Sequence, residues 1–306
     1  MKNTVIWLDG ALVPQKEASI PLTTHTLHYG SGAFEGIRCY ATDNGPAVFR
    51  LSDHVERLLQ SFSCFGAPFP WSKEAIEQAI IATIKANAFE DCYIRPIIFF
   101  GGESLLLSPK ELSIHCAILV MDMDKYLGKE PIRMGISSVK RIHPESMPIH
   151  HKINGFYVNS ILAFHDARSR GFDEALLLDH GGTIAEGSVA NIFFVVDGVL
   201  ITPSTTSILP GITRSTILSI AKELGIETRV ETLPLEIIEK ATEAFLCGTA
   251  SEITPIKSIE SKYFSAPGGM TQALHTEYQS AIRGKRKEPA LMSRSWVTFV
   301  NGEGNL

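Results

Sequence analysis

Lys152 is the residue of this sequence whose surroundings best suit covalent chemistry. A short glycine-containing turn follows it, and apolar residues after the turn predict a helix over residues 157–170. A lysine just ahead of a helix, with isoleucine and phenylalanine as neighbours, can lose hydration, which favours the neutral amine over the ammonium. The neutral amine attacks an aldehyde. A lone lysine is more often a solvated surface residue, so other stretches must decide.

One carboxylate and two turns of small residues could complete such a site. Glu186 is the sole acid in the β stretch predicted over 183–196, where an embedded carboxylate needs a positive or protonated partner. Segment 209–214 puts a glycine and a threonine at the start of a predicted helix, where N–H groups and a hydroxyl can bind an anion. Segment 248–250 is a second such turn. Taken singly, a rim carboxylate and a plain helix cap are simpler interpretations.

Two stretches in the first half of the chain could supply the walls of a binding site. Segment 21–40 mixes three glycines with aromatic residues, and glycine lets a backbone approach a ligand or another strand closely; a strand with bulges is the simpler interpretation. In the strongly β run 92–101, Tyr93 and Arg95 share one face because side chains alternate along a strand.

The remaining elements suggest how these residues are carried. Asp53 is expected to cap a helix that bears Arg57 in its second turn, and a second helix is expected over 72–87. These helices lie between predicted strands, which indicates an α+β first domain over 1–124. A polar stretch with glycine and proline predicts a linker at 125–131, ahead of a larger domain over 132–306 that carries the lysine.

Composition narrows the class of protein. The 306 residues carry a net charge of −5, and the one short basic run, near residue 283, is too isolated to indicate nucleic-acid binding. Five scattered cysteines indicate reduced thiols, a cytoplasmic location and no zinc site, and adjacent His150 and His151 point to opposite faces rather than to one metal. No segment has the apolar length of a signal core or a membrane span.

Together the pieces suit pyridoxal 5′-phosphate. The cofactor needs a lysine for its aldehyde, a carboxylate for its pyridine nitrogen and donors for its phosphate. The sequence also resembles the branched-chain amino-acid aminotransferases among the fold-type IV pyridoxal-phosphate enzymes, from about residue 7 to residue 283. The resemblance rests on HYGSGAFEGIR at 28–38, YIRP at 93–96, Glu186-Gly with Asn191, LPGITR at 209–214 and GTASEITP at 248–255.

The resemblance implies a two-domain fold of mixed α+β and α/β content, like that of D-amino-acid aminotransferase. It implies that Lys152 is the Schiff-base lysine and the catalytic acid and base. The implied cofactor-binding residues are Arg57, Lys152, Tyr157, Glu186, Leu209, Ile212, Thr213 and Thr249. The implied substrate-binding residues are Tyr29, Phe34, Gly36, Arg38, Tyr93, Arg95, Tyr126, Thr249 and Ala250.

The implied reaction moves an amino group between L-leucine, L-isoleucine or L-valine and 2-oxoglutarate, so branched-chain amino acids, their 2-oxo acids and glutamate are the implied ligands. The resemblance also implies at least a homodimer, with a hexamer as a larger alternative, in which the partner contributes a loop near Leu106. D-amino-acid transaminases and aminodeoxychorismate lyases share the lysine, the glutamate and the phosphate turns, and a non-enzymatic oligomeric module is the rival from another class.

This chain departs from the family at several positions. Met123 stands where bacterial relatives often carry tryptophan, Val189-Ala190 replaces a more usual Gly-Glu or Gly-Ser pair, and His150-His151 replaces smaller residues. These changes affect the width of the expected pocket, whereas each expected catalytic group is present.

Overall fold

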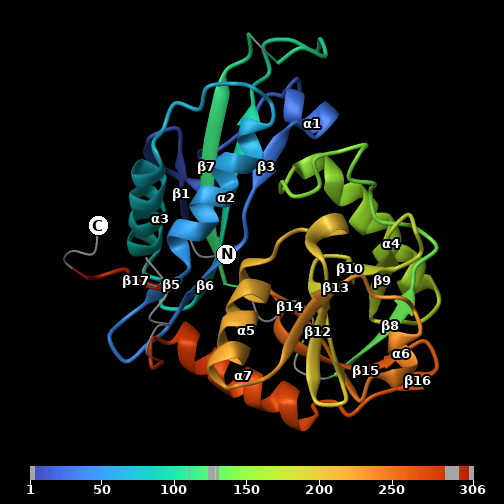
Figure 1. Ribbon diagram of the computed structural model, residues 1–306. Helices are drawn as coiled ribbons and strands as arrows, with labels where there is room; N and C mark the ends of the chain where they lie inside the picture. Colours follow the sequence, from blue (N-terminus) through green and yellow to red (C-terminus); the bar gives the residue numbers. More distant parts are fainter. Residues whose placement is uncertain (1–3, 110, 123–127, 129–130, 287–295, 303–306) are drawn as a thin grey trace.

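The computed structural model describes residues 4–109, 111–122, 128, 131–286 and 296–302. These residues form two β-sheets, each with its own helices, and Figure 1 shows the first, mostly blue to green, above the second, mostly green to orange. None of the helices in these ranges is long and apolar enough to cross a membrane. The mixed two-sheet architecture confirms the expected fold class.

The first sheet is built mainly from antiparallel pairs and is covered by α2 (Leu51–Ser63) and α3 (Lys73–Asn87). Ile76, Ile80 and Ile84 of α3 are fully buried against it, as their spacing predicts. The strand order is β17 (Val297–Phe299), β5 (Ala47–Phe49), β4 (Ile37–Tyr40), β6 (Cys92–Phe100), β7 (Ile114–Met121), β1 (Val5–Leu8) and β2 (Ala11–Pro14), with β3 (Gly32–Phe34) beside β6.

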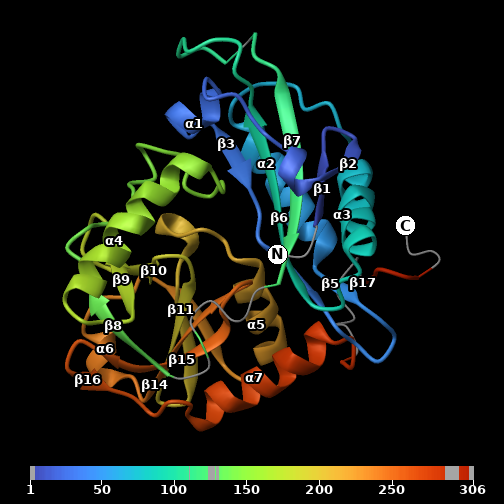
Figure 2. The same ribbon diagram turned by 180° about the vertical axis from the view of Figure 1, so that it is seen from behind.

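The second sheet carries α4 (Tyr157–Ser169) against β8 and β9, whereas α5 (Ile212–Glu223) and α7 (Gly269–Ile282) pack against β14. Figure 2 shows α4 well separated from α5 and α7. The strand order is β10 (Ile184–Gly187), β9 (Glu174–Leu178), β8 (Ile132–Ile136), β15 (Glu252–Ile259), β14 (Glu243–Gly248), β11 (Asn191–Val196), β12 (Val199–Pro203) and β13 (Thr228–Glu231), with β16 (Lys262–Tyr263) beside β15. The short α6 (Ile237–Lys240) packs on β11.

The two sheets share a hydrophobic core. Tyr40 and Phe49 of the first sheet lie in one cluster with Phe193 and Phe245 of the second sheet and Tyr278 of α7. Burying these large side chains together ties the two parts of the chain to each other.

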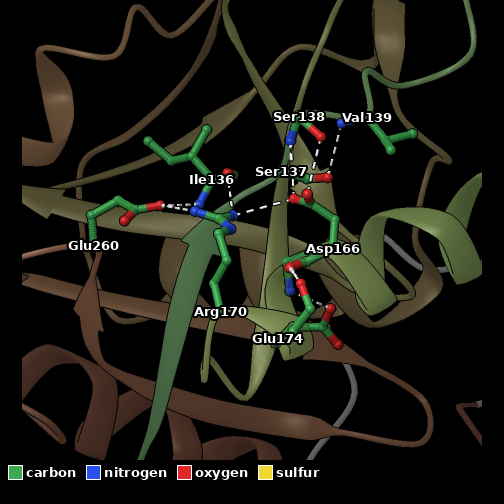
Figure 3. Close-up of polar contacts among 10 residues, drawn as sticks. Ile136, Ser137, Ser138, Val139, Asp166, Arg170, Glu174 and Glu260 are labelled. Carbon is green, nitrogen blue, oxygen red and sulfur yellow. Dashed lines mark hydrogen bonds and ion pairs between the residues drawn. The ribbon is translucent and has the colours of Figure 1, made fainter.

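The C-terminal end of α4 is held by a polar network (Figure 3). Asp166 accepts hydrogen bonds from the backbone N–H and hydroxyl of Ser138, at 3.1 and 3.0 Å. Arg170 donates to the carbonyl of Ile136 at 2.6 Å and to the carboxylate of Glu260 at 3.1 Å. These contacts fix α4 to the loop after β8, and the opposite end of α4 carries Tyr157.

Three sequence expectations differ from the structure or fall outside it. The prediction that Asp53 caps a helix is wrong: α2 begins at Leu51, with Arg50 as its N-cap in the left-handed region at φ 54°. Asp53 instead pairs with Arg50 in the first turn. Segment 21–40 contains a short helix, α1 (His25–Tyr29), before β3 and β4. The linker predicted at 125–131 lies mostly outside the described residues.

Candidate active site

The backbone at Lys152 is held by the first part of the chain. The Lys152 N–H donates to the hydroxyl of Ser61 on α2 at 2.8 Å, and its carbonyl accepts from the N–H of Phe34 at 3.2 Å. The turn after Lys152 packs directly on Gly30, where a Cβ would lie 2.6 Å from Gly155 Cα. Gly30 has φ 65°, so both the space and the conformation require glycine there. The lysine therefore lies between the two sheets.

The amine of Lys152 lies in an aromatic and polar setting. Its Nζ donates to the hydroxyl of Tyr157 at 2.5 Å and lies 5.0 Å from the centre of the Phe34 ring. The Phe34 and Tyr157 rings are 4.7 Å apart at a tilt of 60°. Aromatic walls limit the hydration of the amine, and the tyrosine fixes its direction.

Glu186 is the carboxylate that faces this site, and it is 6% exposed. It accepts hydrogen bonds from the side-chain amide of Asn191 at 3.0 Å and from the N–H of Leu209 at 3.4 Å. Arg141 Nε forms an ion pair with Glu186 Oε1 at 2.8 Å. Burial raises the pKa of Glu186, and the positive charges of Arg141 and Lys152 oppose the rise.

An anion site lies where α5 begins. Within the described part of the chain no side chain caps this helix, so the N–H groups of its first turn, at Ile212 and Thr213, are available to a ligand. Arg57 reaches the same place from α2, because its Nη1 donates to the carbonyl of Pro210 at 3.2 Å. A guanidinium beside a helix N-terminus suits a phosphate group.

The opposite wall is formed by strands of the first sheet. A Cβ at Gly36 would lie 2.1 Å from the hydroxyl of Tyr93, so only glycine leaves room for this tyrosine side chain. Arg95 Nη2 donates to that hydroxyl at 2.9 Å, and the guanidinium lies 4.6 Å from the centre of the Phe34 ring. Arg95 Nε is buried and has no hydrogen-bond partner among the described residues.

Most of the expected residues line a single pocket, two described residues lie elsewhere, and one residue lies outside the described ranges. Tyr29 is 47% exposed and donates to the carbonyl of Leu105 at 2.8 Å, at a separate hollow. Arg38 is buried and pairs with Asp91 at 2.9 Å, away from the pocket. Tyr126 lies outside the described residues, as does Met123. The expected residues that line the pocket are Phe34, Gly36, Arg57, Tyr93, Arg95, Lys152, Tyr157, Glu186, Leu209, Ile212, Thr213, Thr249 and Ala250.

The structure adds residues that sequence reasoning missed. Arg141 is the positive partner that an embedded Glu186 requires, but no local pattern distinguishes it from other arginines. Glu35 and His54 form a buried pair beside Arg57. Glu35 lies in the glycine-rich segment 21–40, where no local pattern marks it as a partner of Arg57. His151 also lines the pocket.

Comparison with known proteins adds the family. The model of the amino-transferase class IV family matches residues 32–259. The chain belongs to this family. A branched-chain-amino-acid aminotransferase of Pseudomonas aeruginosa is 40% identical over 305 residues, which cover 98% of each chain. The chain is thus a class IV aminotransferase along nearly its whole length.

Solved structures of branched-chain aminotransferases agree with this fold. The enzyme of Thermoproteus uzoniensis, solved with norvaline, superposes with a TM-score of 0.92 at 40% identity and covers 97% of this chain and 99% of its own. The T.th. enzyme, solved with N-(5′-phosphopyridoxyl)-L-glutamate, has a TM-score of 0.92 at 38% identity, and the match covers 98% of this chain and 100% of that one.

Proposed function

We propose that this aminotransferase uses pyridoxal 5′-phosphate to move the amino group between L-branched-chain amino acids and 2-oxoglutarate. The observation that best supports this proposal is a single pocket lined by Lys152 and Glu186. The Lys152 amine is hydrogen-bonded to Tyr157, and the carboxylate of Glu186 is buried. The names of the similar enzymes, and the norvaline and phosphopyridoxyl-glutamate in two of their structures, support the choice of substrates and cofactor.

The residues present fit that cofactor. The N-terminus of α5 and Arg57 offer donors for a phosphate, and Glu186 offers a buried carboxylate for a ring nitrogen. Lys152 lines the same pocket as both. Ile212 by its backbone, and Arg57, Thr213 and Thr249 by their side chains, would hold the phosphate, and Leu209 would pack against the ring.

When bound, pyridoxal phosphate supplies an aldehyde for the amine and a ring that accepts electrons from the substrate α-carbon. Lys152 would take the proton from the substrate α-carbon and hold it at Nζ for return, because a neutral amine can act as a general base. The Tyr157 hydroxyl lies 2.5 Å from that Nζ and holds the amine in place. The same hydroxyl would bind the ring oxygen of the cofactor. Glu186 would keep a proton on the ring nitrogen, and Asn191 and Arg141 hold its carboxylate in place.

The substrate side must accept two kinds of side chain in turn. Phe34 and the Tyr93 ring offer apolar surface for leucine, isoleucine or valine, and Arg95 offers an unused buried N–H for the distal carboxylate of glutamate. The amides of Thr249 and Ala250 would bind the α-carboxylate that all these substrates share. Tyr29, Arg38 and Tyr126 remain proposals for the same side.

Arg95→Ala is therefore expected to damage the glutamate half-reaction by about 1.5–3 kcal/mol, the usual worth of a hydrogen bond to a charged group. The leucine half-reaction should be much less affected, because the side chain of leucine carries no charge for Arg95 to bind. Single-turnover kinetics, followed by the absorbance of the bound cofactor, measure each half-reaction separately. Equal losses on both sides would show that Arg95 binds the α-carboxylate or only supports the fold.

Activity with a panel of L- and D-amino acids and 2-oxoglutarate tests the function as a whole. We expect turnover with L-leucine, L-isoleucine and L-valine and little with D-amino acids. A preference for D-amino acids, or release of pyruvate from aminodeoxychorismate, would assign the chain to another activity of the fold. A protein that gains no visible absorbance with added cofactor would be no enzyme of this kind.

We also propose that the chain acts as at least a homodimer in the cytoplasm. The start of α4 lies beside α1, and the Leu106 carbonyl, in the loop after β6, contacts His25 of α1. Large apolar side chains are exposed on these two helices and this loop: Leu27 61%, Leu106 76%, Leu107 78%, Val158 58%, Ile161 53% and Leu162 54%. A surface of this kind favours burial against a second copy. Sedimentation at micromolar concentration should show dimers or a larger assembly such as a hexamer; monomers would contradict the proposal. Four of the five free cysteines are buried, which suits a reducing compartment.

A further inference from the structure

Glu35 is a fully buried carboxylate next to the pocket, between β3 and β4, at 0% exposure. Its two oxygens accept from Arg57 Nε at 2.5 Å and from Arg57 Nη2 at 3.0 Å. His54 Nδ1 donates to it at 2.8 Å, and the N–H of Gly36 at 3.2 Å. Glu35 therefore occupies one whole edge of the Arg57 guanidinium.

Glu35 and Arg57 form an ion pair with one negative and one positive charge. Burial alone would raise the pKa of Glu35, but the charge of Arg57, together with the hydrogen bonds from His54 and Arg57, holds it well below its usual range. Burial lowers the pKa of His54, so this histidine is a neutral donor near pH 7. Glu35 and Arg57 thus balance each other inside the protein.

The other edge of Arg57 faces the pocket. Nη1 donates to the carbonyl of Pro210, just ahead of the uncapped N-terminus of α5. An anion held at that helix end becomes a second negative partner of the same guanidinium. Glu35 and such an anion therefore share one positive charge.

We propose that Glu35 is the counter-ion that keeps Arg57 paired before the cofactor arrives, and that it thereby sets how tightly the cofactor phosphate is held. The inference rests on the proposed function, which places a phosphate at Arg57 and α5.

The sign of the effect follows from linkage. In the cofactor-free protein, Glu35→Gln leaves a buried guanidinium without a counter-charge, which is strongly destabilising. A bound phosphate restores an anion to Arg57, so the same substitution should cost the phosphate-bound protein less stability. A ligand that stabilises the variant more than the wild type must bind the variant more tightly.

The test is thermal unfolding of cofactor-free protein, alone and with increasing inorganic phosphate. We expect Glu35→Gln to unfold at a lower temperature than wild type and to bind inorganic phosphate about tenfold more tightly or better, the effect of relieving an unpaired charge. Pyridoxal, which lacks the phosphate, should stabilise the variant and the wild type by the same increment. Glu174→Gln is the matched control, because Glu174 is equally buried but accepts from the backbone N–H groups of Ala175 and Ser188.

Two results would overturn the inference. Unchanged phosphate affinity in Glu35→Gln would make Glu35 a purely structural residue, and weaker affinity would mean that it is needed to aim Arg57 at the phosphate. If Glu35→Gln fails to fold even with phosphate, Glu35→Asp, which keeps the charge but shortens the reach to Arg57, must bind phosphate more tightly than wild type or the inference is wrong. A wild-type protein that pyridoxal phosphate stabilises no better than pyridoxal would instead contradict the proposed function.

Discussion

Lys152→Ala is expected to abolish transamination and the visible absorbance of the lysine-bound cofactor. In the described part of the pocket no other lysine is present, so no second amine can replace the Nζ that bonds to Tyr157. The loss covers both the covalent link and the proton transfer, so activity should fall to the background of the assay. The measurements are steady-state turnover and covalent retention of the cofactor after borohydride reduction.

Lys140→Ala is the matched control. This exposed lysine lies between β8 and α4, as Lys152 does, but it does not line the pocket. It should keep wild-type turnover and retain the cofactor on reduction. Appreciable turnover by Lys152→Ala without an added amine would remove Lys152 from the reaction, whereas recovery on adding a small amine would support its role as the base.

Glu186→Gln should bind the cofactor but react far more slowly. The amide keeps the shape and one acceptor for Asn191, but it lacks the charge that keeps a proton on the ring nitrogen. A charge-stabilising contact of this kind is typically worth about 10²–10⁴ in rate. Cofactor affinity and single-turnover rate, measured on the same preparation, separate binding from chemistry.

The expected pattern is a rate loss without a matching loss of bound cofactor. Glu174 is a second buried glutamate, but it is held by backbone N–H groups and does not line the pocket, so Glu174→Gln should leave the rate near that of wild type. A Glu186→Gln rate within a few-fold of wild type would mean that another group keeps the ring protonated.

The sequence predicted which of these residues meet in one pocket, because local motifs carry them. Lys152 ahead of a helix, Glu186 alone in a β stretch and the glycine–threonine start of α5 are all features of short segments, and the structure places them around one pocket. Helix α3 also follows its apolar spacing, with Ser72 as N-cap accepting from the N–H of Ala75.

Contacts between distant segments could not be predicted in this way. Arg141 meets Glu186, and Glu35 meets Arg57, only after two parts of the chain have folded together. The apolar residues of α4 give a second example: Val158 and Ile161 are exposed, so their hydrophobicity does not mark the core of this chain. Periodicity shows that a face is apolar, but not what covers it.

The last described strand has a consequence for synthesis of the protein. β17 pairs with β5 in the first sheet, although residues 132–286 lie between the two parts of that sheet, and the carbonyl of Trp296 accepts from the N–H of Arg50 at 2.6 Å. While the ribosome is still making the second half, β5 has an unpaired edge that other chains can join. Chains that end before residue 296 should therefore aggregate during expression, even though every pocket residue named above has already been made.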